Sequence, residues 1–106
     1  MVESLVGALK DAGYWAFGAD SGNKAIKLFE SNRVDLVLLE FALPDNSGDV
    51  VGRRMNLLKP KVPVIIYTVL PDDANECCDF AEVVIAKPQH PEAVIERVKE
   101  VLGQRV

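Results

Sequence analysis

The 106-residue sequence is poor in the residues from which disulfide frameworks and structural zinc sites are built. It has one histidine and two cysteines, Cys77 and Cys78, which are adjacent. Adjacent cysteines seldom pair with each other, and CxxC spacing is absent, so we expect neither a disulfide nor a zinc site. A redox role would need a basic neighbour to lower a thiol pKa, and the local sequence offers none. These features predict a reducing compartment.

Clusters of positive charge and long apolar runs are also missing. The 12 Lys and Arg are outnumbered by 16 Asp and Glu, and the net charge is −4. This balance argues against nucleic-acid binding by the domain. No apolar run reaches the roughly 18 residues of a membrane span, and no signal peptide opens the chain. We therefore expect a cytoplasmic protein without membrane association.

The common catalytic and nucleotide-binding motifs are absent as well. The sequence contains no GxGxxG, GxxxxGK[ST], GxSxG or HExxH. His90 has no Ser or Cys partner in a recognisable motif, so we interpret it as a surface or helix-cap residue. We expect no enzyme activity, no cofactor and no bound metal.

What the chain does contain is a regular alternation of apolar runs and amphipathic stretches. Hydrophobic residues make up 49% of the sequence, enough for one core, so residues 1–106 predict a single domain. Strands are predicted over residues 14–18, 34–39, 62–68 and 83–87. Helices are predicted over residues 2–12, 22–32, 48–58 and 71–80, and from Pro91 onward. This order predicts an α/β fold with a parallel sheet covered on both faces.

Polar residues stand where the predicted strands end. The run 34–39 ends in Glu40, with Pro44 four residues later and Gly48 eight residues later. Three further residues close the later strands: Thr68, Lys87 and Pro88. Sites in open α/β sheets lie at the carboxyl ends of the strands, so we expect these residues to share one site.

In this order and at these positions, the residues resemble the receiver domain of two-component response regulators, the CheY-like family. The resemblance covers nearly the whole chain and implies a flavodoxin-like three-layer sandwich. In the family, the position of Glu40 holds a phosphate-accepting Asp. The position of Thr68 bonds the phosphoryl group, and Lys87 corresponds to the Lys that pairs with it and precedes a commonly cis Pro88. The resemblance also implies protein partners, a histidine kinase or an output protein, which contact residues 71–102.

The sequence departs from the family pattern at several positions that phosphorylation needs. Glu40 is one methylene longer than Asp, and misplacement on the scale of an ångström can cost on the order of a hundredfold in rate. The family's first strand and its Mg²⁺-binding acidic residues are missing, because the sequence enters the first helix directly. Val69 replaces a usually small residue, and Val84 replaces an aromatic switch. The interval from Thr68 to Lys87 is short, which predicts a shortened fourth helix.

The missing first strand would lie in the centre of the family's sheet. Either residues 14–18 pair directly with residues 34–39, or exposed strand edges pair with another copy of the chain. We therefore expect a homodimer or a swapped assembly. Trp15 and Phe17 are expected to pack in the core, or in an intermolecular contact if the sheet is incomplete.

The residues support two interpretations of Glu40. It is a phosphomimetic that forms an ion pair with Lys87, or it is a degenerate remnant that faces water. The resemblance and its departures together predict an atypical receiver domain, a protein-interaction module that works without phosphorylation. The alternatives are a phosphorylatable receiver truncated at its N-terminus and a structural or assembly domain.

Overall fold

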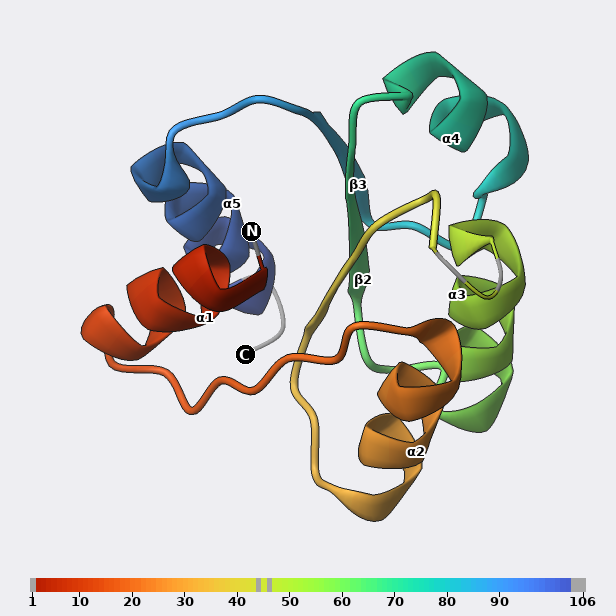
Figure 1. Ribbon diagram of the computed structural model, residues 1–106, viewed down its shortest axis with the longest axis horizontal. Coiled ribbons are helices and arrows are strands. Elements are labelled where there is room, and N and C mark those ends of the chain that lie inside the picture. The colour runs from red at the N-terminus through yellow and green to blue at the C-terminus, as the bar shows by residue number, and fades with distance from the viewer. Residues whose placement is uncertain (1, 44, 46, 104–106) are drawn as a thin grey trace.

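The computed structural model describes residues 2–43, 45 and 47–103 (Figure 1). Within these residues the sheet has three parallel strands in the order β1-β2-β3. The strands are β1 (Val37–Leu39), β2 (Val64–Thr68) and β3 (Val83–Ala86). Each strand is shorter than its predicted range, because only part of each apolar run finds a hydrogen-bonded neighbour.

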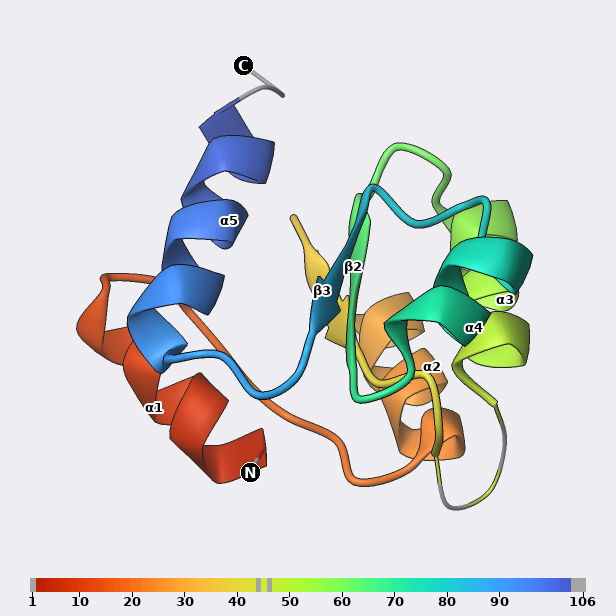
Figure 2. The same cartoon turned by 90° about the horizontal axis from the view of Figure 1, so that it is seen from above.

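Helices cover both faces of the sheet and make a three-layer arrangement. The helices are α1 (Val2–Asp11), α2 (Gly22–Ser31), α3 (Gly48–Leu58), α4 (Pro71–Cys77) and α5 (Pro91–Gly103). Figures 1 and 2 show α1 and α5 on one face and α2, α3 and α4 on the other. The predicted flavodoxin-like α/β fold is confirmed. None of the helices in the described ranges is long and apolar enough to cross a membrane.

The central strand β2 explains how the layers are held together. All five of its residues are buried, as expected for a parallel strand covered on both faces. Val64 and Ile66 belong to the apolar cluster that includes residues of α2, α3 and α4. Ile65 and Tyr67 belong to the second cluster, with the inward face of α5. Alternation along a single strand therefore supplies both halves of the core.

The helix boundaries follow from local capping. The Ser21 hydroxyl accepts a hydrogen bond from the Lys24 N–H at the start of α2, and Ser47 does the same for Val50 at the start of α3. Helix α4 begins at Pro71 without a side-chain cap and is seven residues long. It is shorter than the predicted helix over residues 71–80, in agreement with the short interval before Lys87.

The predicted strand over residues 14–18 is wrong. Residues 14–19 have no regular secondary structure, and they connect α1 on one face of the sheet to α2 on the other (Figure 1). The expectation of a core position is also wrong, since Trp15 is fully exposed and Phe17 is 51% exposed. The physical reason is the lack of a neighbouring strand: β-propensity reflects packing on a half-buried pleated surface, and this segment has none.

One edge of the sheet is open as a result. In the described sheet β1 pairs only with β2, so the direct pairing of residues 14–18 with residues 34–39 does not form. An open cavity of about 750 Å³ lies between α1 and α2 beside this segment. Val6 and Leu28 contribute apolar walls, and lysines from both helices also line it.

Substitution of Gly48 tests how closely the chain packs after β1. It is buried at the start of α3, and its N–H donates to the main-chain oxygen of Phe41 at 2.5 Å. An added Cβ would lie 2.7 Å from the Cα of Phe41, against backbone that cannot move aside. We expect Gly48→Ala to lower the free energy of unfolding by about 1–3 kcal/mol in chemical denaturation.

Gly7→Ala is the matched control for that substitution. Gly7 lies in α1 with no atom within 4 Å of the position of an added Cβ. Ala is favoured over Gly in a helix interior by about 0.5–1 kcal/mol, so this variant should be at least as stable as the native chain. Equal effects of the two substitutions would contradict the packing described at Gly48.

Candidate functional site

The polar residues predicted to share a site meet at one edge of the sheet. Glu40 follows β1, Thr68 ends β2 and Lys87 follows β3. Because the three strands are parallel neighbours, their carboxyl ends bring these side chains together. Lys87 is joined to Pro88 by a cis peptide bond. Pro44, which was also predicted to belong to the site, lies outside the described residues.

An ion pair between Glu40 and Lys87 forms the centre of this site. The Lys87 ammonium nitrogen lies 2.5 Å from Oε1 of Glu40. The Lys87 side chain is only 9% exposed and that of Glu40 is 24% exposed, so water screens the pair less than at an open surface. The ion pair that one of the two interpretations of Glu40 required is therefore present.

Further donors engage the rest of the Glu40 carboxylate. Oε2 accepts hydrogen bonds from the backbone N–H of Phe41 at 2.7 Å and of Ala42 at 3.3 Å. Partial burial raises the pKa of Glu40, but the interactions with Lys87, the Thr68 hydroxyl and the Ala42 N–H together outweigh this effect, and the pKa is lowered. Glu40 is thus held as an anion and does not simply face water.

Tyr67 supports the ammonium side of the pair. The Lys87 nitrogen lies 5.1 Å from the centre of the Tyr67 ring, within the range of a cation–π contact. The Tyr67 hydroxyl accepts from the Gln89 N–H at 3.0 Å and donates to the Gln89 carbonyl at 3.3 Å. Sequence reasoning missed this residue. The available clue was an aromatic residue directly before Thr68, at the end of an aliphatic strand.

Asp45 is a second residue that the sequence did not single out. Its carboxylate accepts hydrogen bonds from the backbone N–H groups of Gly22 at 2.8 Å and Asn23 at 3.1 Å. These bonds lower the pKa of Asp45. The contact fastens the loop after Glu40 to the start of α2, where exposed N–H groups favour an anion. No sequence pattern joins residues so far apart in the chain.

His90 lies outside this site, as predicted. It is exposed just before α5, and its Nδ1 accepts a hydrogen bond from the Glu92 N–H at 3.3 Å. Its carbonyl oxygen accepts from the N–H groups of Ala93 and Val94. The interpretation of His90 as a surface residue that caps a helix is confirmed.

Comparison with known proteins identifies the class to which this fold and site belong. The family model of the response regulator receiver domain matches residues 1–99. The chain therefore belongs to the response regulator receiver domain family, and the resemblance noted in the sequence is confirmed. It is a receiver domain of the two-component type.

Individual relatives agree with this assignment. The phosphate regulon transcriptional regulatory protein PhoB of Pseudomonas aeruginosa is 30% identical over 105 residues, which cover 94% of this chain and 46% of PhoB. The chain thus spans about half the length of the curated relatives that it matches.

Solved structures show the same fold. A CheY-like receiver domain from Methanospirillum hungatei has a TM-score of 0.89 at 24% identity, with 97% of this chain and 85% of that chain covered. The response regulator TrrA of Thermotoga maritima, solved in complex with Mg²⁺-BeF, has a TM-score of 0.86 at 27% identity. That match covers 93% of this chain and 87% of TrrA.

The ion pair between Glu40 and Lys87 should make the stability of the fold depend on pH. The folded-state pKa of Glu40 lies below its ordinary value of 4.5. Its stabilising contribution is therefore complete above that value and is lost as the pH falls through the lower folded-state pKa. At pH 7 we expect Glu40→Gln to lower the free energy of unfolding by about 1.5–3 kcal/mol, since charge-assisted hydrogen bonds are lost.

Urea unfolding of both proteins between neutral and acidic pH measures this difference. The difference in the free energy of unfolding between the native chain and Glu40→Gln should disappear as the pH falls below 4.5. Glu30→Gln, at an exposed position of α2, is the control and should change stability by no more than about 0.5 kcal/mol. A difference in the free energy of unfolding that stays constant with pH would show that the charge of Glu40 does not contribute to stability.

Proposed function

We propose that this receiver domain is an atypical one, which works as a protein-interaction module without phosphorylation. The observation that carries the proposal is the engagement of the Glu40 carboxylate by Lys87 on one oxygen and by backbone N–H groups on the other. A negative charge is thereby held at the strand ends at all times. In the phosphomimetic interpretation that charge replaces the one that phosphorylation would add.

The chemistry of the site supports this proposal. Phosphoryl transfer to a carboxylate requires an oxygen that is free to attack and a cation that neutralises the incoming phosphate. Both oxygens of Glu40 already accept hydrogen bonds, and Lys87 is committed to one of them. Among the described residues, no group of three metal-ligating side chains includes Glu40. The donors present thus suit a fixed anion better than a reversible acceptor.

We place the partner contact on residues 71–102, the face to which the family resemblance points. The exposed residues of α4 include three acids, Asp72, Asp73 and Glu76. Val69 and Leu70, just before α4, are 65% and 41% exposed. A protein partner with a basic rim and an apolar centre complements this surface, whether it is a histidine kinase or an output protein. The domain would act as one unit in the cytoplasm, as a regulator and not as an enzyme or a nucleic-acid binder.

We further propose that the chain forms a homodimer through the open edge of β1. An edge strand presents unpaired backbone groups that readily take up another strand. Residues 14–19 are free of regular structure and carry the exposed aromatic rings of Trp15 and Phe17. In a two-fold dimer this segment of each copy would lie against β1 of the other, which would bury both rings.

Intact-mass spectrometry tests phosphorylation directly. After incubation with Mg²⁺ and acetyl phosphate, a small acyl-phosphate donor, we expect the native chain to keep its original mass. Glu40→Asp is the matched variant, because it restores the shorter carboxylate. A phosphoryl adduct on the native chain would refute phosphorylation independence. An adduct on Glu40→Asp alone would show that the extra methylene of Glu40 is what prevents phosphorylation.

Light scattering after size-exclusion, over a concentration series, tests the dimer. We expect the mass of two chains for the native protein. Trp15→Glu combined with Phe17→Glu should shift it towards one chain, since both side chains lie at the proposed interface. Leu57→Glu is the control: Leu57 is 83% exposed on α3 and belongs neither to residues 14–19 nor to β1, so its substitution should leave the mass unchanged. A single-chain mass at every concentration would exclude the dimer.

A further inference from the structure

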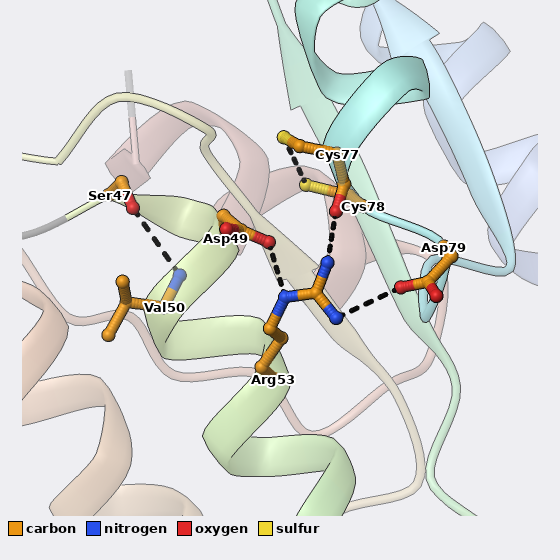
Figure 3. Close-up of polar contacts among 7 residues, drawn as sticks. All are labelled: Ser47, Asp49, Val50, Arg53, Cys77, Cys78 and Asp79. Atoms are coloured by element: carbon orange, nitrogen blue, oxygen red, sulfur yellow. Dashed lines mark hydrogen bonds and ion pairs between the residues drawn. The ribbon is translucent and has the colours of Figure 1, made fainter.

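Three side chains with metal-binding atoms meet where the start of α3 approaches the end of α4. Asp49 lies in the first turn of α3, and Cys77 and Cys78 lie at the end of α4 (Figure 3). One carboxylate oxygen and the two sulfur atoms all lie within 4.8 Å of one another. This cluster is separate from Glu40 and has no part in the function proposed above.

The two sulfur atoms are already spaced almost as a metal ion requires. They lie 3.4 Å apart. A tetrahedral ion with metal–sulfur bonds of about 2.3 Å, the Zn²⁺ value, holds its two sulfur ligands about 3.8 Å apart. A small side-chain rotation closes that difference. Cys78 is 3% exposed, whereas Cys77 and Asp49 are half-buried, so an ion would reach the buried sulfur from their side.

Arg53 fixes the ligands in this arrangement. Its Nε donates to Oδ1 of Asp49 at 2.7 Å, and another of its nitrogens donates to the main-chain oxygen of Cys77. A third contact joins it to the carboxylate of Asp79 at 3.1 Å (Figure 3). One guanidinium therefore holds the carboxylate ligand and the end of α4 together. Hydrogen-bonded support of this kind orients ligating carboxylates in metal sites.

Burial separates the two thiols. The Cys78 side chain is shielded from water, whereas that of Cys77 is partly accessible. A thiol gives up its proton when it binds a metal ion, and each metal–thiolate bond compensates for that loss.

We propose that Asp49, Cys77 and Cys78 form a binding site for one thiophilic divalent cation of the Zn²⁺ type. On binding, both thiols release their protons to solvent, and two thiolates and one carboxylate become ligands. The fourth position is left for water on the half-exposed side of Cys77. The ion and the Arg53 guanidinium together balance the three negative ligands. The bound ion would clamp α4 to α3, next to the surface proposed to contact a partner.

The sequence alone led us to expect no metal site. CxxC spacing is absent, and the only histidine lies elsewhere. The third ligand, Asp49, comes from a different helix, so no local sequence motif indicates it. Arg53 is likewise the basic neighbour of the cysteines that the local sequence lacked.

Titration of the reduced, metal-free chain with Cd²⁺ tests the site. Cd²⁺ is a thiophilic probe whose bonds to thiolate absorb in the ultraviolet, and Zn²⁺ can then be measured by competition. We expect one Cd²⁺ per chain, with absorption from two thiolates. Affinity should fall on the order of tenfold in Asp49→Asn and at least as much in Cys77→Ser. Thermal unfolding of the native chain should shift upward with Cd²⁺, because the folded chain binds the ion better than the unfolded one.

Asp72→Asn is the matched control. It removes an exposed carboxylate from the first turn of α4, at the other end of that helix from the cysteines, and leaves Arg53 and the three ligands in place, so its affinity for Cd²⁺ should equal that of the native chain. Circular dichroism establishes that each variant is folded before titration. Equal binding by the native chain and Asp49→Asn, or no upward shift in thermal unfolding with Cd²⁺, would reduce the cluster to an ordinary thiol pair and overturn the proposal. The absence of stoichiometric Cd²⁺ binding would overturn it as well.

Discussion

The ion pair between Glu40 and Lys87 is the contact on which the functional edge of this domain depends. It joins the end of β1 to the end of β3 across β2, whose last residue, Thr68, lies beneath it and is fully buried. A charge this close to the interior is stable only when it is paired and hydrogen-bonded. The loop after β1 satisfies that need with its own N–H groups, so the conformation of the loop and the charge of the site are linked.

Contacts between separate helices and loops recur elsewhere in the molecule. Asp45 ties the same loop to the start of α2, and Arg53 ties α3 to the end of α4. Each uses a charged side chain to satisfy backbone groups that helix ends leave without intrahelical partners. Within the described residues, by contrast, β1 is paired on one side only and residues 14–19 have no strand partner. The domain is therefore well fastened at its strand ends and incompletely covered at one side of its sheet.

Sequence reasoning predicted the parts of the fold that local pattern controls. The run that ends at Thr68 is apolar at every central position, so a strand buried on both faces was the natural prediction. The fully apolar inward face of α5 was equally clear. Residues 14–18 show the limit of such reasoning. Their aromatic residues favour a strand, but a strand exists only where a neighbour supplies hydrogen bonds, and that neighbour is set by topology.

By itself, the sequence determined the α/β class, the family and the three residues Glu40, Thr68 and Lys87 at the strand ends. These follow from apolar periodicity and from the order of polar residues along the chain. Only the tertiary structure decided what surrounds them. It placed the Tyr67 ring beside Lys87, Asp45 at the start of α2, and Asp49 with Arg53 beside the two cysteines. Those contacts join residues far apart in sequence, and their geometry exists only after the helices have packed on the sheet.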